Sequence, residues 1–107
     1  MLKELKDRLK KYSENQIVFN EPHFSQQLAL REGSRKEVIS NLLNPDNLKY
    51  YYKENGKYGD TIYCLHFRIS NTRTIRLPVI FDRGGKKNLY IITYIMRHRA
   101  WQNIIRR

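Results

Sequence analysis

The spacing of apolar residues changes near residue 45, and this change restricts the folds that the chain can adopt. In the first part, Leu2, Leu5 and Leu9 recur at the spacing of an amphipathic helix. In the second part, apolar and polar residues alternate, as in Thr61–Ile69 and Thr74–Phe81. Helices followed by neighbouring strands are typical of the α+β class. Since 107 residues is the length of one domain, we predict a single α+β domain.

Three helices are predicted before the change of period. The first spans residues 1–15, and a helical pair occupies residues 20–44. Asn20 is a residue type that caps helices, and it precedes the second helix. Ser34 and Glu37 have the spacing of a capping box, which begins the third helix.

Residues 47–96 are predicted to form an antiparallel sheet of about four strands. Pro78 cannot donate a ladder hydrogen bond, so its strand is expected at an edge or beside a bulge. Arg83-Gly84-Gly85-Lys86 predicts a glycine-rich hairpin. Leu89–Met96 is the most apolar strand and is expected to be central. After the sheet, apolar residues predict a short C-terminal helix around Trp101, Ile104 and Ile105.

The charge of the chain is strongly positive and unevenly distributed. There are 21 Lys and Arg residues against 10 Asp and Glu residues, a formal net charge of +11. From Thr61 to Arg107, ten basic residues oppose one acid, Asp82, which places +9 in this part. Such a surface attracts a polyanion, and arginine is suited to two-point phosphate contacts. RNA is the predicted partner, and a surface that is merely basic and soluble is the alternative.

The sequence also indicates a compartment. Cys64 is the single cysteine, so neither an internal disulfide nor a cysteine-based metal site is expected. There is no run of about 18 apolar residues and no apolar segment typical of a signal peptide near Met1. We therefore expect a cytoplasmic protein that does not span a membrane and needs no metal or cofactor.

No motif of a phosphate-cradling loop, metal cluster or nucleophile elbow is present. Histidine, arginine and tyrosine side chains remain, and these suit RNA cleavage in which the 2′-OH is the nucleophile. His23 and Arg31 lie eight residues apart, about two helical turns, which places them roughly on one side. They are either an acid/base group with a phosphate partner, or a helix-start histidine and a solvated arginine.

Two further groups are candidates for RNA contact. His66 and Arg68 share a strand face that Arg76 could extend, as a phosphate surface or as the solvent face of an amphipathic strand. Tyr94 and Arg97 close the last strand, where Tyr94 is either functional or part of the core. The tyrosines at positions 50 to 52 could stack on bases or pack within the sheet.

Several segments of the chain resemble a known family. Phe19-Asn20-Glu21-Pro22-His23, Arg31-Glu32-Gly33-Ser34 and Leu42-Leu43-Asn44-Pro45 resemble the opening of DUF4258-type families, and Tyr90–Tyr94 resembles their last core strand. These families are assigned to the RelE/ParE-like toxin superfamily, within a broader group of metal-free ribonucleases. The resemblance implies helices followed by an antiparallel sheet. Gln27 stands where such families often carry a basic residue.

The resemblance implies a RelE-like toxin ribonuclease that cleaves RNA by metal-free acid/base chemistry, with an acidic antitoxin-like protein as a second partner. The expected catalytic residues are His23 as acid or base, Arg31, Arg76 and Arg97 on the phosphate, and Tyr94 for positioning or protonation. The expected RNA-binding residues are Lys36, His66, Arg68, Arg73, Arg83, Lys86, Lys87 and Arg99. The alternatives are a non-catalytic nucleic-acid-binding module on the same scaffold and a subunit that binds an acidic protein.

Overall fold

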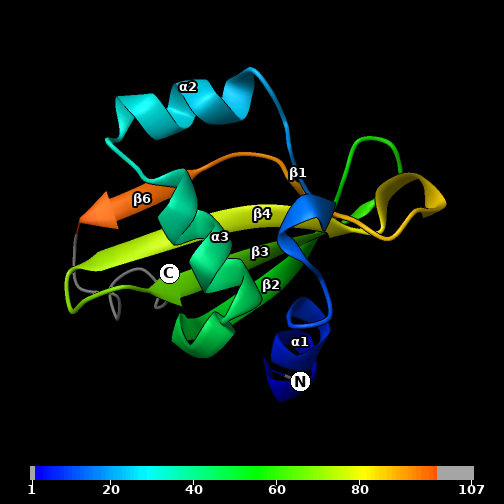
Figure 1. The fold of residues 1–107 in the computed structure, drawn as a ribbon, viewed down its shortest axis with the longest axis horizontal. Helices are drawn as coiled ribbons and strands as arrows, with labels where there is room; N and C mark the ends of the chain where they lie inside the picture. The colour runs from blue at the N-terminus through cyan, green and yellow to red at the C-terminus, as the bar shows by residue number, and fades with distance from the viewer. Residues whose placement is uncertain (1, 99–107) are drawn as a thin grey trace.

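The three helices precede every strand except the short β1, which follows α1, and α3 lies across the sheet with α2 above it and α1 below it in Figure 1. The structure is a computed structural model, and it describes residues 2–98. The predicted C-terminal helix lies outside these residues. The helices are α1 (Leu2–Leu9), α2 (His23–Leu30) and α3 (Arg35–Leu43), and the short 3₁₀ turns are η1 (Glu14–Gln16), η2 (Pro45–Asn47) and η3 (Arg83–Gly85). The strands are β1 (Ile17–Phe19), β2 (Leu48–Asn55), β3 (Thr61–Arg68), β4 (Arg73–Phe81), β5 (Leu89–Ile91) and β6 (Ile95–His98).

The sheet is mixed rather than purely antiparallel, and it contains six strands rather than about four. Its order is β1-β5-β4-β3-β2, and β6 pairs with the other half of β4. The pair β1–β5 is parallel and every other pair is antiparallel. The short apolar segment 16–19 is compatible with a link or a strand by sequence, because three or four residues are too few to show an alternating pattern, and in the structure Ile17–Phe19 is strand β1.

The predicted strand Leu89–Met96 is interrupted, and Pro78 lies opposite the interruption. Val79 pairs with Ile91 and Arg76 with Ile95, so the three residues 92–94 face only the two residues 77 and 78. The Pro78 carbonyl accepts from the Ile92 N–H at 3.0 Å. The N–H and C=O groups of a strand residue point to the same neighbouring strand. The side of Pro78 that lacks an N–H therefore faces residues 92–94, where the neighbouring strand has one residue more than β4. The predicted bulge is therefore in the partner strand, and β4 is not an edge.

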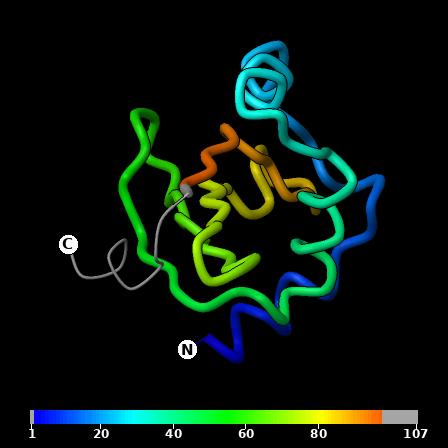
Figure 2. Tube along the Cα trace, turned by 90° about the vertical axis from the view of Figure 1, so that its left-hand side faces the viewer, coloured from blue at the N-terminus to red at the C-terminus, as the bar shows by residue number. Residues whose placement is uncertain are grey.

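The two faces of the sheet alternate as predicted. Leu65, Phe67, Ile75, Leu77 and Val79 point into the core, where they meet helix residues such as Phe24, Val38 and Leu42. Figure 2 shows α2 and α3 on one side of the strands. The residues between these core positions point to the opposite face, which we call the far face. This face carries His66 and Arg76.

The helix boundaries differ from the predictions in two ways. The first helix ends at Leu9 instead of near residue 15. Asn20 does not cap α2 with its side chain, since its amide donates to the Ile92 carbonyl at 3.1 Å. The Glu21 carboxylate accepts from the Ser25 N–H at 3.0 Å instead.

No helix within residues 2–98 is long and apolar enough to cross a bilayer.

Candidate nucleic-acid interface

Strand register places several predicted RNA-binding residues side by side on the far face. Tyr50 pairs with His66, and His66 pairs with Arg76, across three neighbouring strands. Two residues further along these strands, Arg68 pairs with Thr74, and Thr74 pairs with Arg97 on β6. Directly paired residues in antiparallel strands point to the same face. The predicted grouping of His66, Arg68 and Arg76 is therefore confirmed, and Arg97 joins it.

Aromatic rings lie among these cations. The rings of Tyr50 and Tyr52 lie 5.2 and 5.7 Å from the His66 ring, and 6.1 Å from each other. The Arg76 guanidinium lies 5.8 Å from the centre of the Tyr52 ring, within the range of a cation–π contact. Tyr51 points the other way and stacks on Tyr63 at 6.2 Å. The run of three tyrosines thus gives two rings to the far face and one to the helix side.

Burial decides which groups of the far face a ligand can reach. Cys64 is fully buried and His66 is 6% exposed. Burial raises the pKa of the Cys64 thiol, and the thiol donates to Glu54 at 3.3 Å. The half-buried side chains are those of Tyr50, Tyr52, Arg68, Arg76 and Arg97. These tyrosines and arginines form the accessible surface, and His66 is the support beneath them.

The helix side holds the other predicted catalytic residues. His23 is exposed, and its Nε2 lies 3.0 Å from Thr93 Oγ1. At the other end of α2, Arg31 Nη1 donates to the Met96 carbonyl at 3.5 Å. Eight residues of helix span roughly 12 Å. His23 and Arg31 therefore contact the same segment, residues 93–96, at two separate points.

Tyr94 is a core residue. Its side chain is fully buried, and its ring packs edge-on against Phe24 with centres 6.3 Å apart. Its hydroxyl contacts the Met96 sulfur at 3.7 Å. Burial raises the pKa of Tyr94, and the positive charge of Arg73 opposes this shift. The hydroxyl therefore remains protonated at neutral pH and lies away from solvent.

Arg73 is engaged inside the protein. Both Nη atoms donate to Glu37, at 2.8 and 3.1 Å, and Nε donates to the Met96 sulfur at 2.9 Å. Hydrogen bonding to Glu37 raises the pKa of the Arg73 guanidinium. Its donors are thus directed at α3 and β6 rather than at solvent.

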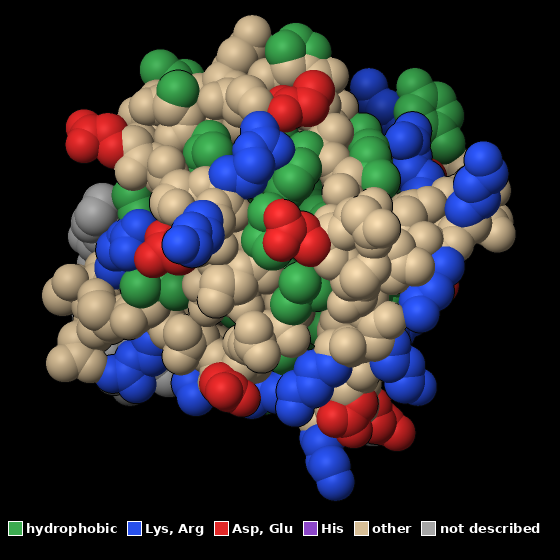
Figure 3. Space-filling model, viewed as in Figure 1, with side chains coloured by type: hydrophobic (Ala, Val, Ile, Leu, Met, Phe, Trp, Pro, Cys, Tyr) green, Lys and Arg blue, Asp and Glu red, His purple; other side chains and the backbone are tan. Residues whose placement is uncertain are grey.

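The five predicted catalytic residues do not share one surface. His23, Arg31 and Tyr94 are on the helix side, whereas Arg76 and Arg97 are on the far face. Figure 3, which views the helix side, shows basic side chains mixed with acidic and apolar ones. Of the other predicted RNA-binding residues, Lys36 is exposed on α3, Arg83 lies 4.1 Å over the Tyr90 ring, Lys86 and Lys87 follow η3, and Arg99 lies outside the described residues.

The sequence did not suggest a role for Thr93 or Met96. The structure shows that His23 contacts the Thr93 hydroxyl and that Arg31 donates to the Met96 carbonyl. The signal for both was weak, since each falls inside an apolar run that predicts an ordinary strand.

No protein-family model matches the chain, and no curated protein or solved structure matches it significantly. The resemblance to DUF4258-type families therefore remains a prediction that rests on the quoted segments.

Proposed function

We propose that this protein binds RNA through the far face of its sheet. The observation that carries the proposal is the register that places Arg76 beside Tyr52 and His66, with Arg68 and Arg97 one step along. Arginine contacts to phosphates release counterions, and tyrosine rings offer stacking surfaces for unpaired bases. Single-stranded RNA fits this combination best, because a duplex hides its bases.

Net charge supports the same proposal. The chain carries +11, and three arginines of the far face come from three different strands. The acid on this part of the face, Glu54, accepts a hydrogen bond from Cys64. Among the described residues, a face that combines several cations with an acid engaged by Cys64 attracts an anionic polymer over long range. An acidic protein of antitoxin type would compete for the same face.

A second candidate function is metal-independent RNA cleavage on a RelE-like scaffold. The observation that favours it is the exposed His23 imidazole beside Thr93, with Arg31 further along the same segment. In such a reaction His23 accepts the proton of a 2′-OH, whose oxygen bonds to phosphorus as the bond to the 5′-oxygen breaks. Water protonates the leaving 5′-oxygen, and Arg31 stabilises the charge on the phosphate.

The two candidate sites lie on opposite sides of β6. Within the described residues, β6 pairs with β4 alone, so it forms an edge there. Arg97 faces the far side of this edge, and the Met96 carbonyl on the same strand receives Arg31. A single RNA strand that crosses this edge would meet Arg97 first and Arg31 second.

Binding and cleavage are separated by one assay with a labelled single-stranded RNA in EDTA. We expect Tyr52→Leu and Arg76→Gln to weaken binding, each by roughly five-fold to ten-fold. The matched control is Lys57→Gln, an exposed residue in the β2–β3 turn. If His23→Ala abolishes formation of 2′,3′-cyclic phosphate ends without weakening binding, the cleavage proposal holds. Unchanged binding in both far-face variants would contradict the main proposal.

A further inference from the structure

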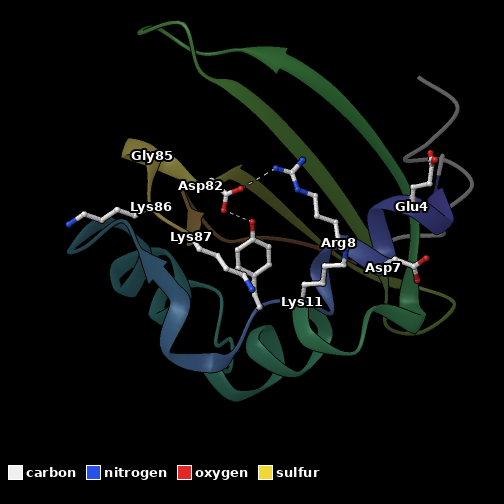
Figure 4. Close-up of a pocket in the computed structure, with 9 residues that line it drawn as sticks. Glu4, Asp7, Arg8, Lys11, Asp82, Gly85, Lys86 and Lys87 are labelled. Atoms are coloured by element: carbon white, nitrogen blue, oxygen red, sulfur yellow. Dashed lines mark hydrogen bonds and ion pairs between the residues drawn. The ribbon is translucent and has the colours of Figure 1, made fainter.

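Residues of α1 and of the segment around η3 line an open groove of about 760 Å³ (Figure 4). Lys86 and Lys87 come from the loop, and Lys11 comes from the chain just after α1. Glu4 and Asp7 line the opposite end of the groove, on α1 (Figure 4). The loop end of the groove is therefore its basic end.

The loop backbone is open at this end. Gly84 and Gly85 have φ values of 73° and 78°, a left-handed conformation that side chains rarely adopt. Apart from the glycine itself and its two chain neighbours, no described heavy atom lies within 4 Å of the position that a Cβ would take at either glycine. Within the described residues, the backbone N–H groups of Lys86 and Lys87 donate no hydrogen bond to another backbone group. Two adjacent donors thus stand beside unobstructed backbone.

The Asp82 carboxylate also lines the groove, and it is directed at Tyr12 and Arg8. It accepts from the Tyr12 hydroxyl at 2.6 Å and from Arg8 Nη2 at 3.4 Å, as the dashed lines in Figure 4 mark. No ion pair among the described residues involves Lys11, Lys86 or Lys87. The Lys87 ammonium lies 5.6 Å from the centre of the Tyr12 ring, which forms part of the groove wall.

We propose that the basic end of this groove is a phosphate-binding site. The N–H groups of Lys86 and Lys87 donate to the phosphate oxygens, and the ammonium groups of Lys11 and Lys87 balance the charge, while the Lys86 side chain extends outward from the loop and adds positive charge at longer range (Figure 4). Gly85, which lines the groove, lets the phosphate approach the backbone closely. The site goes beyond the proposed RNA face, since it uses none of the residues of that face.

The position of the loop is fixed from its other side. Arg83 lies 4.1 Å over the Tyr90 ring, and the Asn88 amide donates to the Arg83 and Lys86 carbonyls at 2.9 and 3.0 Å. The Asp82 N–H donates to the Asn88 carbonyl at 2.7 Å. These bonds orient the loop before any ligand arrives, which lowers the entropic cost of binding.

The test is a titration with inorganic phosphate at constant ionic strength, followed by amide NMR shifts. We expect saturable shifts at Gly84, Gly85, Lys86 and Lys87, and roughly ten-fold weaker binding in the Lys86→Ala/Lys87→Ala variant. Lys57→Ala is the control and should change nothing. Shifts that never saturate, or the same affinity in the double variant, would overturn the site.

A short RNA in place of phosphate identifies the source of the group. If RNA shifts the same four amides, the site takes a phosphodiester, and if only inorganic phosphate does so, it takes a free phosphate or phosphomonoester. Both outcomes support the site. Failure of the far-face proposal can be distinguished from failure of this site. If Arg76→Gln leaves RNA binding intact, the far-face proposal is wrong, and the phosphate titration of the loop amides is not affected by that result.

Discussion

The Arg73 guanidinium and the Glu37 carboxylate form a two-point ion pair, with N–O distances of 2.8 and 3.1 Å, that joins β4 to α3. Glu37 was predicted to complete a capping box with Ser34. The structure contains half of that box, because Ser34 Oγ accepts from the Glu37 N–H at 3.2 Å while the Glu37 carboxylate turns to Arg73. A residue that would have capped a helix therefore links two layers of the fold.

Breaking this pair is expected to destabilise the protein. The Arg73 and Glu37 side chains are 28% and 27% exposed, so solvent screens them only in part. We expect Arg73→Met and Glu37→Gln each to lower the free energy of unfolding by about 1–3 kcal/mol in urea denaturation. The double variant should lose less stability than the sum of the two single losses, because both variants break the same interaction. A loss of RNA affinity in Arg73→Met without loss of stability would instead show that Arg73 binds RNA.

Gly33→Ala is expected to disturb the packing of Tyr94. A Cβ at position 33 would lie 2.7 Å from Tyr94 Cζ and 2.7 Å from Leu28 Cδ1, which is closer than real contacts allow. Since Tyr94 is fully buried, its ring has little room to move, and we expect a loss of about 1–3 kcal/mol. In thermal denaturation the double variant Gly33→Ala/Tyr94→Leu should lose less stability than the sum of the two single variants, because the smaller side chain relieves the clash.

The contact between Tyr12 and Asp82 is expected to give stability that depends on pH. Burial, together with the hydrogen bond to Asp82, raises the pKa of Tyr12 from 10.0 to about 12. This contribution is present below pH 10 and is lost as the pH rises through about 12. The hydrogen bond from Tyr12 lowers the pKa of Asp82 from 3.8, so stability is also lost as the pH falls below this value.

The measurement is the difference in unfolding free energy between the wild type and Tyr12→Phe as a function of pH. We expect the difference to be constant at neutral pH and to shrink in both directions. Tyr58→Phe is the control, because the Tyr58 side chain is 89% exposed. A Tyr12→Phe difference that is the same at pH 7 and above pH 12 would contradict the assignment.

Local patterns predicted the α+β class and part of the fold. Alternation in β3 and β4 identified both faces of these strands, and the Ser34 signal placed the start of α3. The break between β5 and β6 could not be predicted, because residues 89–96 are apolar except for Thr93 and read as one strand. What interrupts the strand is a tertiary effect, namely Pro78 on β4 and the burial of Tyr94 in the core.

The candidate site was less predictable than the fold. The helical spacing of His23 and Arg31 was informative, but it could not show that Arg76 and Arg97 would lie on the opposite face. Face assignment for Arg97 depends on its pairing with Thr74, a register that only the bulge at residues 92–94 fixes. A shift by one residue reverses every side chain of a strand, so the prediction for Arg97 required the structure.

Salt dependence of RNA binding tests which face holds the RNA. Each phosphate that a protein cation neutralises on single-stranded nucleic acid adds about 0.7 to the slope of log K against log salt. We expect Arg76→Gln and Arg97→Gln each to lower this slope by about that amount, measured by fluorescence anisotropy. Arg31→Gln should leave the slope unchanged if RNA stays on the far face. A lower slope in all three variants would show that the RNA crosses the β6 edge, which brings a phosphate to the helix side where His23 lies. A lower slope in Arg31→Gln alone would place the RNA on the helix side and contradict the far-face proposal.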